Sequence, residues 1–299
     1  MHESELPLRP DGSIYHLAIR PGQASHRCIL VGDPERVSLA EPLMERIEFR
    51  GGNREFRWIT GIYKGASITV VGTGIGPDNT EIALLELDAV HNIDLSRRQP
   101  FPTQKKMYFL RIGTSGLVQP EVPVGTAVFT RIAIGIDAMP LFYGDSPISP
   151  ATEALQHYWY KRTGRTLPWY VVEATPFFQE MYDKVKIEDI STVSGITYTA
   201  PGFYAPQGRT LRRPVAFPQM PWLLSHFSYG DEKVQNIEME ASCLYLLARL
   251  LGHEAGALCL GVAHRLRGEM LYGNGSGMSP QQAITLLLKA GLEWLSHAP

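Results

Sequence analysis

The stretch GITYTAPGFYAPQGR, residues 195–209, brings several unusual side chains into one loop after a short apolar run that predicts a strand. These side chains are two aromatic rings, a planar amide and a guanidinium: Phe203, Tyr204, Gln207 and Arg209. Aromatic rings stack on flat ligands, while amide and guanidinium groups form hydrogen bonds with a ligand's edge. The loop therefore predicts a site for something flat, with hydrogen-bonding groups on its edge.

Three other expected strand ends carry glycine, hydroxyl or arginine residues. They are Gly32 and Arg36 in VGDPER, Gly72, Gly74 and Gly76 in VGTGIGPDN, and Arg111, Thr114 and Ser115 in LRIGTSG. In open α/β sheets, ligands bind outside the carboxyl ends of the strands. Backbone N–H groups freed by glycine, a hydroxyl and two arginines suit a tetrahedral oxyanion such as phosphate. Each turn alone is equally compatible with a solvated arginine, but three together favour the anion site.

Two glutamates flank a methionine in NIEMEAS, residues 236–242, at the start of an apolar stretch. A carboxylate at a helix N-terminus is stabilised by the helix dipole, which explains one of them as a cap. Glu240 precedes residues expected to be buried, so its carboxylate needs a partner, and the two hydroxyls of a ribose would fit. Arg265 follows another expected strand, although a single arginine there is more often structural.

Short apolar runs alternate with longer amphipathic stretches along the chain. Strands are expected at 27–32, 66–72, 107–113, 125–134 and 257–263, and helices at 81–91, 238–252 and 280–295. A weaker helix begins with Asp33 as N-cap and Pro34, and Pro42 interrupts it. The alternation predicts one α/β domain over 1–299 with a largely parallel or mixed sheet. Two polar stretches, 94–106 and 138–180, are expected to be surface insertions.

The composition excludes some classes of protein. A net charge of −2 argues against a nucleic-acid binder, which usually has a basic excess, but allows a small anionic ligand. Cys28, Cys243 and Cys259 stand among apolar residues without a CxxC motif and are expected to be buried and reduced. No apolar run reaches the roughly 18 residues of a membrane span, and the start does not resemble a signal peptide. We therefore expect a cytoplasmic protein without a membrane partner.

Other kinds of chemistry find less support. GTGIG resembles part of a dinucleotide fingerprint, which would indicate an oxidoreductase, but its third glycine comes one position early. An acidic residue about 20 residues on, at a second strand end, is also missing. The sequence shows no His/Cys cluster with metal-ligand spacing and no serine nucleophile with an evident base. No metal is therefore expected to be required.

Taken together, the motifs resemble the nucleoside phosphorylase-I family, and most of all its uridine phosphorylase branch. The matching motifs are VGDPERV, REF, GTGIG, FLRIGTSG, GFYAPQGR and EMEAS followed by a strand ending in arginine, in family order from about residue 14 to 268. The resemblance implies a three-layer α/β/α fold with a mixed, twisted central sheet. It also implies phosphorolysis, in which a nucleoside and inorganic phosphate, the co-substrate, give a base and ribose 1-phosphate without a further cofactor.

The resemblance also implies a role for each matched residue. Phosphate would be bound by Gly32, Arg36, Arg111 and Thr114, with Arg54 supplied by a neighbouring subunit. Ribose would be held by Met239 and Glu240, with His16 from a neighbour. Phe203 would stack on the base, and Gln207 and Arg209 would read the uracil edge. The catalytic set would be Arg111, Glu240 and Arg265.

Shared sites of this kind imply a homodimer as the minimal unit, usually assembled further into a hexamer. Glu55 matches a position that can help to bind a monovalent cation such as K⁺ at the dimer interface.

Some alternatives stay open. The family's purine branch uses an aspartate after the last strand, where this chain reads GVAHRLRGEM, which favours a pyrimidine. A purine nucleoside phosphorylase, a nucleosidase of the same family and a catalytically silent nucleoside-binding homologue are the alternatives. The alanine and proline before Gly202, and His264 beside Arg265, depart from the family's pattern. The base and sugar are therefore left open, thymidine and deoxyuridine included.

Overall fold

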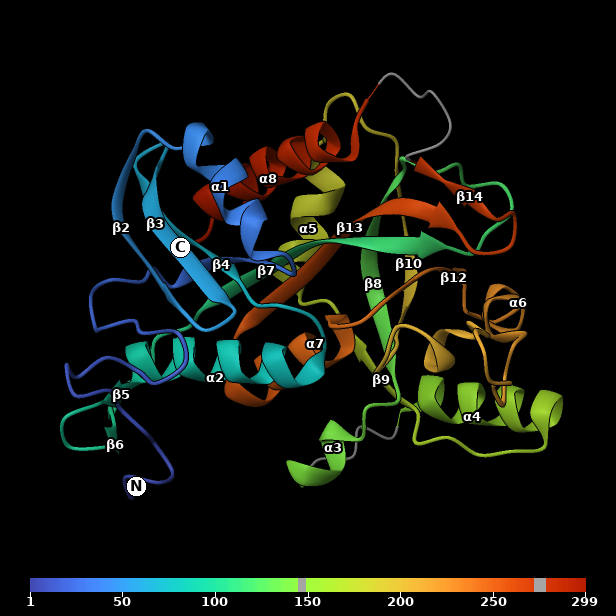
Figure 1. The fold of residues 1–299 in the computed structure, drawn as a ribbon, viewed down its shortest axis with the longest axis horizontal. Coiled ribbons are helices and arrows are strands. Elements are labelled where there is room, and N and C mark those ends of the chain that lie inside the picture. The colour runs from blue at the N-terminus through green and yellow to red at the C-terminus, as the bar shows by residue number, and fades with distance from the viewer. Residues whose placement is uncertain (145–148, 272–277) are drawn as a thin grey trace.

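A mixed, twisted β-sheet runs through the centre of the molecule, and helices cover both of its faces (Figure 1). The computed structural model describes residues 1–144, 149–271 and 278–299. The sheet order is β11-β12-β10-β8-β13-β7-β1-β4-β3-β2, with β9 paired to β8 and β14 to β13. Strand β1 lies parallel to β7 and β4, so the chain segments that leave these three neighbours meet at one edge.

The strands have the following bounds. They are β1 (Arg27–Val31), β2 (Arg46–Asn53), β3 (Phe56–Tyr63), β4 (Ala66–Gly72), β7 (Tyr108–Leu117), β8 (Ala127–Gly135), β9 (Tyr170–Glu173), β10 (Thr192–Thr199), β11 (Ser228–Tyr229), β12 (Glu232–Glu238), β13 (Glu254–His264) and β14 (Glu269–Met270). The six strands expected from apolar runs, including the one that leads into the 195–209 loop, correspond to β1, β4, β7, β8, β10 and β13.

Two layers of helices sandwich the sheet (Figure 1). One layer contains α1 (Val37–Ala40), α5 (Pro176–Lys184) and α8 (Pro280–Ser296), and the other contains α2 (Pro77–Asn92) and α7 (Ala241–Leu251). Successive side chains of a strand point toward opposite helix layers. In β7, Leu110 and Ile112 lie against Gly291 of α8, while Arg111 between them faces the other side of the sheet. The predicted three-layer α/β/α fold is confirmed.

Helix boundaries differ from the expectations in three places. Helix α7 begins at Ala241 and not at residue 238, because the chain up to Glu238 belongs to strand β12. Helix α2 begins at Pro77, four residues before the expected start, because proline suits the first helical turn. The helical segment that follows β1 is capped, as expected, by the Asp33 side chain, which accepts from Glu35 N at 2.9 Å. That segment is short, with η1 (Pro34–Arg36), α1 and η2 (Glu41–Leu43), because Pro42 starts a new 3-10 turn.

The two expected insertions behave differently. Residues 94–106 are largely exposed, with a small hairpin of β5 (Ile93–Asp94) and β6 (Gln99–Pro100) at their start. The expectation that 138–180 lies on the surface is wrong for much of that stretch, whose residues 145–148 lie outside the described residues. It holds α3 (Met139–Phe142), α4 (Pro150–Thr163), β9 and α5, and it buries Trp159, Trp169 and Phe178. These aromatic side chains supply enough apolar surface to extend the core.

The remaining global expectations concern cysteines and membranes. Cys28, Cys243 and Cys259 are buried and free, as expected. No helix within the described ranges is both long and apolar enough to cross a membrane.

Candidate active site

A cavity of about 870 Å³ opens at the edge of the sheet where β1, β4, β7, β12 and β13 end. Most of the residues predicted to be functional line it: Gly32, Arg36, Glu55, Arg111, Thr114, Phe203, Gln207, Arg209, Met239 and Glu240. They come from five separate parts of the chain, and the parallel strands β7, β1 and β4 bring the glycine and arginine turns together. The cavity is therefore where the sequence-predicted chemistry gathers.

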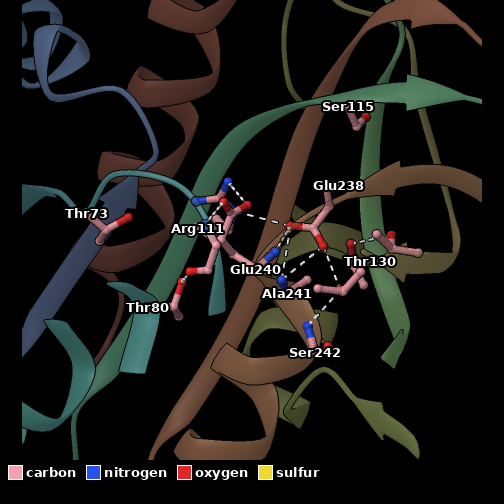
Figure 2. Close-up of polar contacts among 12 residues, drawn as sticks. Thr73, Thr80, Arg111, Ser115, Thr130, Glu238, Glu240, Ala241 and Ser242 are labelled. Carbon is pink, nitrogen blue, oxygen red and sulfur yellow. Dashed lines mark hydrogen bonds and ion pairs between the residues drawn. The ribbon is translucent and has the colours of Figure 1, made fainter. Parts of the chain in front are cut away.

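Arg111 is the central cation of this cavity, and only 5% of it is exposed. Its Nε donates to Glu238 Oε2 at 3.3 Å, and its Nη2 donates to Glu240 Oε2 (Figure 2). Burial disfavours the charged guanidinium, but Glu240 and Glu238 more than offset this, and the pKa of Arg111 is raised. Arg111 thus stays charged at the wall of the cavity.

Glycines leave the space that Arg111 occupies. A Cβ atom at Gly113 would lie 3.2 Å from both Arg111 Nη2 and Cys259 Sγ, and one at Gly32 would lie 3.5 Å from Nη2. Gly32 was predicted from its place at a strand end, whereas Gly113 was not singled out. Its role becomes visible only once β13 is known to lie beside β7.

Glu238 is a site residue, although its place in the sequence indicates only a helix cap. It does cap α7, since its carboxylate accepts from Glu240 N at 2.9 Å and from Ala241 N at 3.0 Å. It also accepts from Thr199 Oγ1 at 2.6 Å. Arg111 is a further donor to the same carboxylate (Figure 2). One buried carboxylate therefore joins β10, β7 and the start of α7.

Glu240 lies between Arg111 and the first turn of α2. Its Oε1 accepts from Gly76 N at 2.8 Å, so the carboxylate has the partners that its burial demands. Burial raises the pKa of Glu240 to about 7, against the opposing effect of Arg111 and with help from the charge of Glu238. Glu240 can therefore exchange a proton near neutral pH.

The base loop, residues 203–209, forms the other end of the cavity. Gln207 is buried, and its Oε1 accepts from Arg209 Nη1 and, at 3.4 Å, from Arg265 Nη1. Arg265 Nη2 also donates to the backbone oxygen of Gln207 at 3.2 Å. Two guanidinium groups thus converge on one amide and orient its Nε2 away from themselves.

Phe203 lies at the mouth, 50% exposed, with its ring centroid 3.8 Å from the guanidinium carbon of Arg209. Burial and the nearby charge of Arg265 lower the pKa of Arg209 to about 10, and burial lowers the pKa of Arg265. Two partly desolvated cations side by side predict a strong attraction for a ligand oxygen that carries negative charge.

A buried polar chain ends at Ser115 on the cavity wall. Asn236 Nδ2 donates to Ser115 Oγ at 2.9 Å, and Asn236 Oδ1 accepts from the Thr197 hydroxyl at 2.7 Å.

His264, which departs from the family's pattern, is also buried, and its Nδ1 accepts from Leu266 N at 3.3 Å. It thereby holds the turn that follows Arg265.

Three predicted residues do not line this cavity: Arg54, His16 and Arg265, although Arg265 contacts Gln207, which does. Arg54 sits in the β2–β3 turn, where its Nη2 donates to Tyr15 Oη at 3.2 Å. Asn53 Nδ2 donates to the backbone oxygens of Tyr15 and His16, each at 3.2 Å, which joins the N-terminal segment to the same turn. The structure therefore brings Arg54 and His16 together with each other, but not with Arg111.

Glu55, the residue predicted to help bind a cation, is exposed and lies on the wall between this cavity and a neighbouring one of about 590 Å³. Gly74 lies close to Glu55, and Asn79 lies close to Gly74. Within the described ranges, no three His, Cys, Asp or Glu side chains form a group that could hold a metal ion. The monovalent cation stays a prediction.

The fold and this cavity define an α/β/α protein with a site that places two arginines, a buried carboxylate and an amide–guanidinium pair around one space. Residues 26–270 match the model of the phosphorylase superfamily, and the chain belongs to that superfamily, as a nucleoside phosphorylase-I type pentosyltransferase. This family assignment leaves the oxidoreductase interpretation of GTGIG without support.

Individual relatives agree with this assignment. A uridine phosphorylase of Thermococcus kodakarensis is 30% identical over 266 residues, which cover 89% of this chain and 83% of the relative. A DeoD-type purine nucleoside phosphorylase of Listeria welshimeri is 26% identical over 255 residues, which cover 85% of this chain and 88% of the relative. A crystal structure of a Trypanosoma brucei nucleoside phosphorylase, described as showing uridine phosphorylase activity, has a TM-score of 0.86 and 31% identity over 98% of this chain and 100% of that chain.

Proposed function

We propose that the protein catalyses the phosphorolysis of a pyrimidine nucleoside, converting uridine and inorganic phosphate to uracil and ribose 1-phosphate. One observation carries the proposal: a single cavity holds Arg36 and Arg111 for phosphate, Glu240 for the ribose hydroxyls, and the Gln207 clamp for the base. The relatives described as uridine phosphorylases support the same reaction.

The geometry suggests how the reaction would proceed. A phosphate oxygen held beside Arg111 would attack C1′ of the ribose while the C1′–N1 bond breaks. The bonding electron pair leaves with the base, whose negative charge spreads over the uracil oxygens, and the base then takes a proton from water. Arg209 and Arg265 would stabilise that charge, and preorganised donors of this kind commonly lower a barrier by about 3 kcal/mol each.

A pyrimidine is favoured over a purine by the residues after β13. In the described segment 265–271 the acidic side chain is Glu269, which pairs with Arg267 at 2.9 Å and does not line the cavity. A purine leaving group would need a proton donor near its N7 atom. Because purine nucleoside phosphorylases are also among the relatives, inosine and adenosine belong in the test.

We further propose that Arg54 and His16 complete the site of a partner subunit, which makes a homodimer the minimal unit, and that dimers assemble into a hexamer with K⁺ at Glu55. The edge strand β2 ends next to Arg54 and is largely exposed. An exposed edge strand offers a surface on which a second subunit can pack. Mixing inactive Arg54→Ala and Arg209→Ala chains should restore about a quarter of the wild-type activity, because half of the random dimers are mixed and each has one complete site. No recovery in mixed dimers would refute the sharing.

The deciding experiment follows uracil release from uridine by absorbance, with and without inorganic phosphate. Release that requires phosphate supports the proposal and the anion site together. Release without phosphate would indicate a nucleosidase, and cleavage of inosine or adenosine alone would indicate a purine enzyme. Uracil binding without turnover would indicate a silent nucleoside-binding homologue.

A further inference from the structure

Glu86, in the middle of α2, holds the N-terminal segment that carries His16. Its Oε1 accepts from the His16 backbone N–H at 2.9 Å, and its Oε2 accepts from the Leu17 backbone N–H at 2.8 Å. The same Oε1 lies 2.7 Å from His16 Nδ1. One carboxylate, whose side chain is 12% exposed, thus binds both the backbone and the ring of this segment.

The contact with the ring determines where its hydrogen lies. A carboxylate only accepts hydrogen bonds, so Nδ1 of His16 must carry the hydrogen. In the neutral ring, Nε2 is then an acceptor on the side away from Glu86, as in other carboxylate–histidine pairs. The ring packs edge-on against Tyr15 and Phe56, with centroids 4.9 and 6.4 Å away, and its side chain is 27% exposed. Glu86 therefore fixes the orientation of the His16 ring, while the ring stays partly accessible from outside the subunit.

Anchoring alone does not explain this arrangement, because the segment has other anchors. His91, on the same helix, lies with its Nε2 3.1 Å from the backbone oxygen of Ala24, and Arg98 Nε donates to the backbone oxygen of Leu6 at 3.2 Å. What Glu86 adds to these contacts is control over the tautomer and orientation of one imidazole ring.

We propose that Glu86 is the positioning residue that presents Nε2 of His16 to the 5′-hydroxyl of a nucleoside bound in the partner subunit. The inference rests on the proposed function, in which His16 serves a neighbouring site. It goes beyond that function because Glu86 itself touches no substrate and lies outside the residues that line the cavity. The acceptor Nε2 matches a hydroxyl group, which has a hydrogen to donate.

The test compares uridine with 5′-deoxyuridine, which lacks only that hydroxyl. Glu86→Gln keeps one acceptor oxygen for the backbone N–H groups, but its amide nitrogen cannot accept from Nδ1–H. We expect Glu86→Gln and His16→Ala each to lower kcat/KM for uridine about tenfold, the effect of one hydrogen bond, and to leave kcat/KM for 5′-deoxyuridine unchanged. The double variant should lose no more than either single variant, because both act on one contact.

His91→Ala is the matched control, since it removes another tether of the same segment. It should affect both nucleosides equally. Equal losses on the two nucleosides in Glu86→Gln, or no loss on uridine, would overturn the inference while leaving the phosphorylase intact. A wild-type protein that cleaves neither nucleoside would instead refute the proposed function, and the inference with it.

Discussion

Glu238→Gln is the substitution whose outcome depends most directly on the observed geometry. The carboxylate is buried and accepts hydrogen bonds from Thr199, from Arg111 and from the first N–H groups of α7. Glutamine has almost the same shape, but it replaces one acceptor oxygen by an NH₂ group. That group would face donors whichever way the amide turns, so at least one buried N–H or O–H loses its partner.

The expected loss of stability follows from these contacts. Removing one member of a buried ion pair costs about 3–5 kcal/mol when the remaining charge is left unpaired. Arg111 keeps its contact with Glu240, so the lower end applies. The charge of Glu238 also raises the pKa of Glu240, and its removal lets Glu240 ionise more readily and pair more strongly with Arg111. We therefore expect the free energy of unfolding to fall by about 3 kcal/mol.

Urea unfolding at fixed protein concentration measures this change. Glu180→Gln is a matched control, because it makes the same chemical change at an exposed ion pair with Lys184 and should cost less than about 0.5 kcal/mol. The KM for phosphate should also rise in Glu238→Gln, since Arg111 loses one of its two fixed partners. If Glu238→Gln unfolds at the same urea concentration as Glu180→Gln, Glu238 does not carry the charge assigned to it.

Three further predictions concern the same cavity. Arg209→Ala should reduce uridine cleavage at least a hundredfold and leave thermal unfolding nearly unchanged, because the guanidinium acts on the leaving base; near-normal turnover would remove the clamp assignment. Gly113→Ala should raise the KM for phosphate more than the KM for uridine, because its methyl group would displace the Arg111 guanidinium; steady-state kinetics with each substrate varied would show it. Between about pH 4.5 and about pH 7, the free energy of unfolding of the ligand-free protein should fall more steeply with pH than that of Glu240→Gln. The reason is that the folded state holds a proton on Glu240 that the unfolded chain releases. Free energies of unfolding that change with pH in parallel for the two proteins would contradict this.

The sequence predicted the phosphate end of the site better than it predicted the site's interior. Gly32, Arg36 and Thr114 could be found because each stands just after an apolar run, and parallel strands bring such positions to one edge. The sequence pattern places Glu238 in the helix expected over 238–252, whereas it ends β12. Residues two apart on a strand share a side, so a strand over 236–238 would have placed Asn236 and Glu238 toward the same neighbours. That signal was present, but the apolar run that follows it favoured a helix.

The fold shows a similar limit. The expected strands came from apolar runs that cross the core, and these runs depend little on tertiary context. The stretch 138–180 interrupts the alternation of strands and helices with polar, proline- and arginine-containing sequence, which predicts a surface insertion. Only the fold shows that Trp159 packs on Trp169 and on Phe217, at centroid distances of 5.1 and 5.0 Å. The Phe217 backbone in turn lies close to Gly208 of the base loop. Packing between segments far apart in the chain leaves no local pattern to read.

The charges around Arg111 link proton binding to phosphate binding. In the ligand-free site two carboxylates share this one guanidinium, so a phosphate anion that approaches it must compete with Glu240. Burial has already raised the pKa of Glu240 to about 7, so neutralising this carboxylate near neutral pH costs little free energy. A protonated Glu240 no longer competes with phosphate for Arg111, which then keeps Glu238 as a negatively charged partner, and it still offers an oxygen to a ribose hydroxyl. We therefore expect the proton on Glu240 and the phosphate on Arg111 to favour each other's binding.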